Sequence, residues 1–129
     1  MANPILVTAA LQYTNPAQGI AAKLLQIGGT TNNATFPIVG KNYKQLSCKA
    51  TTTATAIDVS GLSSPGWMLL RNLDPTNPVL LSPSVSSSVF FARIMAGEAA
   101  LFRLDSSVFS PAIVAQNAPV EYEALIIEY

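Results

Sequence analysis

Glu121 and Glu123 are the two side chains whose type and spacing could support a reaction. They stand two residues apart in the segment VEYEALII, where polar and apolar residues alternate. On a strand, residues two apart share one face and lie about 7 Å from each other, and paired carboxylates are what glycoside hydrolysis requires. The simpler interpretation is two solvated residues on an amphipathic strand, and we favour it.

The other residue types needed for common catalytic and metal sites are missing from the sequence. It has no histidine, which removes the commonest general base and metal ligand. The only cysteine, Cys48, can form neither a cysteine-based zinc site nor an intramolecular disulfide. No phosphate-binding GK[ST] motif and no G-x-S-x-G nucleophile elbow occurs. We therefore expect a protein that is not an enzyme, with no catalytic residue, cofactor or metal.

Three arginines interrupt otherwise apolar segments: Arg71, Arg93 and Arg103. A fully buried guanidinium must be paired, because its desolvation is costly. The candidate partners are acids close in sequence: Asp74, Glu98 and Asp105. Alternatively, strand alternation points all three outward with their stems over apolar surface, which we favour for Arg93 and Arg103. For Arg71 a bidentate pair with a carboxylate of a neighbouring subunit is an equal alternative.

The aromatic residues Trp67, Phe90, Phe91 and Phe102 are most simply core residues. Adjacent Phe90 and Phe91 cannot both face inward on a regular strand. One of them therefore needs a covering loop or a partner, and it is a candidate interface anchor. A stacking platform for sugars is the competing use of an exposed aromatic side chain.

Composition indicates one domain that associates with other proteins. The chain has 129 residues, of which 50% are hydrophobic and only 11% charged, against about 25% charged in typical domains. A weakly charged, Ser/Thr-rich surface with no net charge gives little protection against association, so we favour burial in an assembly over a polar monomer. The neutral charge argues against nucleic-acid binding, and no apolar run is long enough for a membrane helix.

The charges are segregated along the chain. Residues 1–57 carry four lysines and no acid, whereas residues 97–129 carry five acids and one arginine. We expect the two regions to pair across one sheet and neutralise each other; complementary faces on neighbouring subunits are the alternative. Cys48 is interpreted as a small buried strand residue, compatible with assembly in a reducing cytoplasm. The N-terminal MANPILVTAALQY lacks the basic region of a signal peptide.

Short apolar segments separated by turn residues predict strands throughout. We expect strands at Pro4–Tyr13, Ile20–Ile27, Phe36–Val39, Tyr43–Val59, Trp67–Leu73, Val79–Leu81, Val89–Met95, Ala99–Leu104 and Val120–Ile127. Turns every 8–12 residues without a long helix predict an all-β fold, a β-sandwich or jelly roll of about eight short antiparallel strands. We expect a single domain over 1–129, in which residues 1–15 form an edge strand or an extended arm. The candidate turn residues are Asp74, Asn77, Gly97 and Glu98, the last two in a hairpin.

Three segments of the sequence resemble those of a known class of proteins. GWMLLRNLDPTN at Gly66–Asn77, AGEAALFRL at Ala96–Leu104 and a closing VEYEALIIEY resemble small β-rich structural proteins of tailed bacteriophages. The resemblance covers about the last seventy residues. It implies a virion component assembled in the host cytoplasm, and it transfers no functional site residue. Pro78 departs from the pattern, in which a β-branched or aromatic residue is expected.

We expect a capsid decoration or cement protein that stabilises the head by contacts with the major capsid protein or other virion proteins. A homo-oligomer, for example a trimer, is expected, with neither nucleic acid nor membrane as a partner. The candidate interface residues are Arg71, Phe90, Phe91 and Arg93. The alternatives are a component of the tail, neck or baseplate, and a carbohydrate-binding β-sandwich used in host attachment.

Overall fold

A computed structural model describes residues 3–7, 9–15, 20–27, 34–38, 42–105, 107 and 110–128 of the chain. Within them it contains twelve strands and no helix. The strands are β1 (Asn3–Val7), β2 (Ala9–Asn15), β3 (Ile20–Ile27), β4 (Ala34–Ile38), β5 (Tyr43–Ala50), β6 (Thr55–Ala56), β7 (Pro65–Asn72), β8 (Val79–Ser82), β9 (Ala92–Ile94), β10 (Ala99–Arg103), β11 (Ala112–Ala115) and β12 (Val120–Glu128).

The chain divides into two compact units, Met1–Val39 and Gly40–Tyr129. In the first unit β1 pairs with β4 and β2 pairs with β3, both antiparallel. The strand predicted over Pro4–Tyr13 is therefore two strands, each in a separate pair, while Ile20–Ile27 is a strand as predicted. Met1, Ala2 and Thr8 lie outside the described residues. That residues 1–129 form one domain stays a prediction, as does an N-terminal arm.

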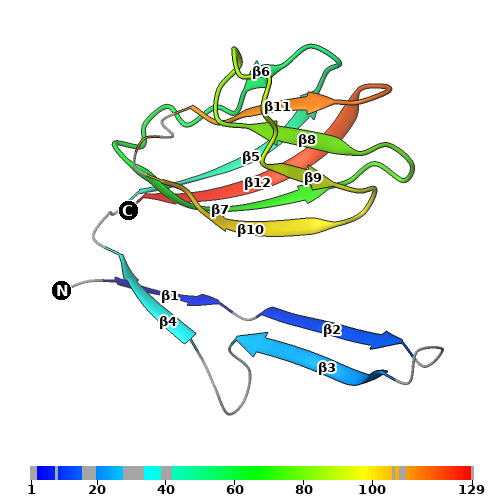
Figure 1. The fold of residues 1–129 in the computed structure, drawn as a ribbon. Helices are drawn as coiled ribbons and strands as arrows, with labels where there is room; N and C mark the ends of the chain where they lie inside the picture. The colour runs from blue at the N-terminus through cyan, green and yellow to red at the C-terminus, as the bar shows by residue number, and fades with distance from the viewer. Residues whose placement is uncertain are drawn as a thin grey trace. The chain divides into compact units, whose positions relative to one another are not determined.

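The second unit is a sandwich of two four-stranded antiparallel sheets, which confirms the predicted fold class (Figure 1). One sheet has the strand order β10-β7-β12-β5 and the other has β6-β11-β8-β9. Along the chain, successive strands alternate between the sheets except at β8 and β9, which are neighbours in one sheet. This connectivity of eight strands is that of a jelly roll.

The core lies between the two sheets and follows the alternation of each strand. On β12, Val120, Tyr122, Ala124 and Ile126 are buried while the residues between them are more exposed. The inward residues of the other strands complete the core: Met68, Leu70, Val79, Leu81, Ile94, Ile113 and Ala115. Burial of such aliphatic side chains is the main source of stability for the sandwich.

Cys48 is exposed, so its predicted burial is wrong. It lies on β5, which has a neighbour in its sheet on one side only. An edge strand of the other sheet, β6, is only two residues long, and Cys48 is exposed between the half-buried Leu46 and the fully buried Ala50. The neighbouring inward residue Leu46 packs against the core as predicted.

Gly97 marks a crossing between the sheets and not the predicted hairpin. β9 and β10 flank it but belong to different sheets, with β10 paired to β7 instead. Gly97 adopts φ +74°, a left-handed conformation that residues with a Cβ rarely adopt. Glu98 closes the turn because its N–H donates to the Met95 carbonyl at 3.1 Å and its carboxylate accepts from the Met95 N–H at 2.9 Å.

Candidate interaction surfaces

The side of the β10-β7-β12-β5 sheet that faces away from the core carries exposed apolar residues, and we call it the outer face. Strand register arranges its residues in rows across the sheet. The middle row is Leu101, Leu69, Leu125 and Gln45. Leu69 is 43% and Leu101 40% exposed. Three leucines side by side therefore remain accessible on an otherwise well-packed sheet.

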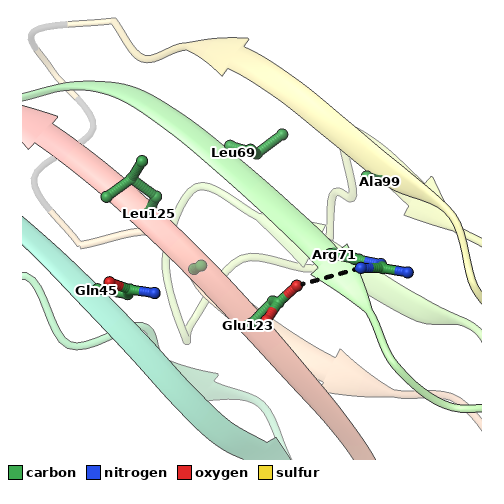
Figure 2. A pocket seen from close by; sticks show the side chains of 7 residues that line it. Gln45, Leu69, Arg71, Ala99, Glu123 and Leu125 are labelled. Atoms are coloured by element: carbon green, nitrogen blue, oxygen red, sulfur yellow. Dashed lines mark ion pairs between the residues drawn. The ribbon is translucent and has the colours of Figure 1, made fainter.

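The next row of the outer face carries its charges. Arg71 lies directly opposite Glu123 on β12 and Ala99 on β10. The Arg71 guanidinium and the Glu123 carboxylate are 3.6 Å apart, and both side chains are about half exposed. Figure 2 shows this ion pair beside Leu69 and Leu125. These residues and Gln45 line a shallow depression of about 330 Å³.

Arg71 is outward and paired, but not with any of the three predicted acids. Its partner is Glu123, more than fifty residues away in sequence, because β7 and β12 are neighbours in the sheet. Asp74 and Asp105 instead accept hydrogen bonds within their own turns, from Asn77 and from Ser107. Those bonds hold the pKa of each aspartate below its usual value.

Arg93 and Arg103 are exposed, as predicted. The Arg103 guanidinium carbon lies 5.5 Å from the centre of the Trp67 ring, on the outer face. This cation–π contact covers one side of the indole, so Trp67 is half-buried on the outer face and is not the core residue that was predicted. Arg93 is the middle residue of β9, in the other sheet, so the fold does not bring it near Arg71 within the jelly roll.

The loop Pro83–Phe91, between β8 and β9, forms the second apolar surface, which we call the 83–91 loop. Its exposed apolar residues are Val85, Val89, Phe90 and Phe91. The strand predicted over Val89–Met95 is shorter, Ala92–Ile94. Phe90 is 46% and Phe91 44% exposed, so neither is a core residue. Phe91 also packs edge-to-face on the half-buried Phe102, with ring centres 5.6 Å apart.

The RNLDPTN segment is a folding element built around two side chains. Asn72 is fully buried, and its amide donates to the Asn77 and Ile94 carbonyls at 2.8 and 3.2 Å. Its side-chain oxygen accepts from the N–H of Asp74 at 2.9 Å. The Asp74 carboxylate then accepts from the N–H groups of Thr76 and Asn77 at 2.8 and 2.6 Å. The turn role predicted for Asp74 and Asn77 is confirmed, and Asn72 links β7 to β9 as well.

Glu128 is a buried acid that the sequence analysis did not single out. It is 5% exposed and its carboxylate accepts from Asn42 N–H, from the Asn42 amide and from Ser63 N–H at 3.2, 3.2 and 2.7 Å. The Ser63 hydroxyl donates to it as well. The alternation of β12 carries the signal, since Glu128 follows the inward residues at every second position. Its bonds are structural, joining β12 to the residues before β5 and β7.

Lysines and acids meet on the β5 side of the jelly roll. Glu121 lies opposite Lys49 in the register of β12 and β5, so the sheet places one lysine of the basic region beside one acid of the acidic region; their mutual neutralisation stays a prediction. Lys44 instead binds Asp58 at 2.6 Å and the Ser60 hydroxyl at 2.7 Å. The bonds from Lys44 and Ser60 hold the pKa of Asp58 far below its usual value.

The acidic side chains of the described residues are dispersed over the jelly roll. No group of three or more His, Cys, Asp or Glu side chains that could hold a metal occurs among them. Glu121 and Glu123 both lie on the outer face, as predicted, where Glu123 is paired with Arg71. No helix in this part of the chain is long and apolar enough to cross a membrane.

The comparisons with known proteins add no relative. Neither the family models, nor the curated proteins, nor the solved structures contain a match to this chain.

Proposed function

We propose that this chain is a structural protein of a bacteriophage virion, and specifically a capsid decoration or cement protein that acts by binding other proteins. Two observations support the proposal. The segments Gly66–Asn77 and Ala96–Leu104 resemble those of phage structural proteins, and the jelly roll is an architecture that viral capsid proteins use. The second observation is an analogy of fold, and one fold serves many unrelated functions, so the binding role is argued from a specific surface.

The main support for binding to other proteins is the exposed apolar surface of the 83–91 loop. Its four exposed apolar side chains stand among four serines, with no charged residue in the loop. Clustered exposed apolar side chains mark protein-binding surfaces. Such surfaces typically have aromatic anchor residues at the centre and a polar rim around them. Phe90 and Phe91 are the anchors and the serines supply the rim. This surface would contact the capsid protein.

Antibody labelling of virions tests where the protein resides. Gold-labelled antibodies against the chain are added to purified virions of the phage that encodes it and viewed by electron microscopy. Label over the head surface is expected. Label confined to the tail, neck or baseplate would favour that alternative, and virions without label or chain would contradict the proposal.

A carbohydrate-binding role has one observation in its favour. Phe91 and Phe102 line a depression of about 290 Å³ together with Pro83, Arg103 and Asp105. An exposed aromatic ring beside charged planar groups can stack on and hydrogen-bond a sugar, and jelly rolls include lectin domains. A glycan array tests it: binding that is lost in Phe91→Ala but kept in the neighbouring variant Phe90→Ala would support this role, and an array without binding would reject it.

A further inference from the structure

The outer face combines apolar and charged residues in a self-complementary order. On the two central strands, β7 carries Leu69 and Arg71, and β12 carries Leu125 and Glu123 opposite them. Arginine on one central strand thus faces glutamate on the other, with leucine beside leucine. The single ion pair between half-exposed groups at 3.6 Å contributes little within one chain, on the order of 0–1 kcal/mol.

Consider a two-fold axis that runs parallel to the strands, between β7 and β12, and relates two copies of the chain. This axis would place each of these residues opposite the complementary residue of the other copy. Such an axis lays β7 of one copy over β12 of the other, and the reverse. Arg71 of each copy then faces Glu123 of the other, and Leu69 faces Leu125. Two facing sheets with nearly aligned strands are a standard packing, and a two-fold contact uses the same patch on both copies.

We propose that two copies of this chain associate through their outer faces about this axis. Each copy contributes the ion pair of Arg71 and Glu123, so four alternating charges surround the axis beside a leucine cluster. The depression between β7 and β12 lies on the axis. Charge complementarity of this kind fixes the register of an interface and excludes other pairings.

The area of the outer face predicts a weak dimer. Four strands spaced about 4.8 Å apart, over seven residues that each rise about 3.3 Å, cover roughly 440 Å². Two copies would bury roughly 900 Å², close to the lower limit of about 1,000 Å² for specific interfaces. The expected dissociation constant is therefore micromolar or weaker. Neighbouring copies held on a capsid would reach high effective concentrations, at which such a contact forms.

Complementary charge reversals test the contact. The Arg71→Glu variant carries two acids at the axis, and the Glu123→Arg variant carries two arginines there. Like charges then face each other in the dimer of either variant, so the dimer affinity of each variant alone should fall at least about tenfold. Mixing the two variants should restore dimers, and native mass spectrometry should find them to be heterodimers. If Arg71 and Glu123 act only through the ion pair within one chain, mixing the two variants should not restore dimers, because each chain still carries two like charges.

A second pair of variants separates the outer face from other apolar surfaces. Leu69→Asp introduces a charge at the centre of the face and should leave only monomers in sedimentation velocity up to about 0.5 mM chain. Val85→Asp, in the 83–91 loop, is the matched control and should dimerise like the unchanged protein. Circular dichroism confirms that each variant is folded.

Three outcomes overturn the proposal. The first is that the chain sediments as a monomer at every concentration. It could form the trimer named from the sequence, or it could form dimers that Leu69→Asp does not affect. The inference extends the proposed function, because it names a second copy as a partner. Sedimentation of the purified chain is independent of capsid binding, so either proposal can fail alone.

Discussion

The carboxylate of Glu128 accepts a hydrogen bond from the backbone N–H of Ser63 at 2.7 Å. This bond joins the end of the last strand, β12, to the loop before β7. The same carboxylate accepts from the N–H and the amide of Asn42, just before β5. A buried carboxylate with several donors is a stable arrangement, and here it closes one end of the β10-β7-β12-β5 sheet.

Glu128→Gln should destabilise the jelly roll by about 1–3 kcal/mol. The substitution replaces a charged acceptor with an amide, whose NH2 group would face the N–H donors of Asn42 or Ser63. Urea unfolding followed by fluorescence measures the change. Glu121→Gln, an exposed acid on the same strand, is the control and should change the free energy of unfolding by about 0.5 kcal/mol or less. Equal effects from both variants would contradict the structural role of Glu128.

Asn72→Ala should be the most damaging polar substitution in the RNLDPTN segment. It leaves the Asn77 and Ile94 carbonyls and the Asp74 N–H without their partner in a buried region, at a cost of about 2–4 kcal/mol. Thermal unfolding measures it against Asn117→Ala, an exposed site outside the segment. A melting temperature like that of Asn117→Ala would show that Asn72 does not hold the turn to β9.

The stability of the protein should fall in acid partly through Asp58. Its bonds to Lys44 and Ser60 lower the pKa in the folded state, so this contribution is present above the unfolded pKa of about 3.9 and is lost as pH falls through the folded value. Asp58→Asn should therefore be less stable than the unchanged protein at pH 7, and the difference should shrink below about pH 4. A difference that is constant from pH 7 to pH 3 would contradict it.

Tyr122 should resist ionisation. Burial, and the neighbouring Cys48, raise its pKa to about 12, so the folded protein keeps a proton that the unfolded chain loses near pH 10. The stability from this difference is present below about pH 10 and is lost as pH rises toward the folded value. Absorbance titration at alkaline pH should show a late phase that Tyr122→Phe removes. A late phase that survives this substitution would assign it to another tyrosine.

The sequence predicted the architecture because alternation and turn residues are local signals. The inward positions of β12 and the outward Glu121 and Glu123 follow from period-two patterning. The same pattern places Glu128 at an inward position. An acid at the end of an apolar strand nevertheless suggests exposure to solvent, unless the groups that donate hydrogen bonds to its carboxylate are known. Those donors, Asn42 and Ser63, lie 65 residues or more away in sequence, so no local pattern reveals them.

The surfaces were predicted less well because they depend on which strands become neighbours. Arg71 and Glu123 meet through the register of β7 and β12, which no segment encodes by itself. Gly97 was interpreted as a hairpin residue because a turn within one sheet and a crossing between two sheets use the same residue types. Phe90 and Phe91 are predicted on a strand with one of them inward, but both lie exposed in a loop before β9, because the strand begins only at Ala92.

Binding to capsids that lack the protein tests the central claim most directly. The purified chain is mixed with such capsids and pelleted, and the bound amount is measured as the chain concentration rises. The account predicts saturable binding that is reduced at least about tenfold by Phe90→Ser in the 83–91 loop, and retained, in reduced amount, by the monomeric variant Leu69→Asp. The absence of the protein from the capsid pellet at every concentration would contradict it.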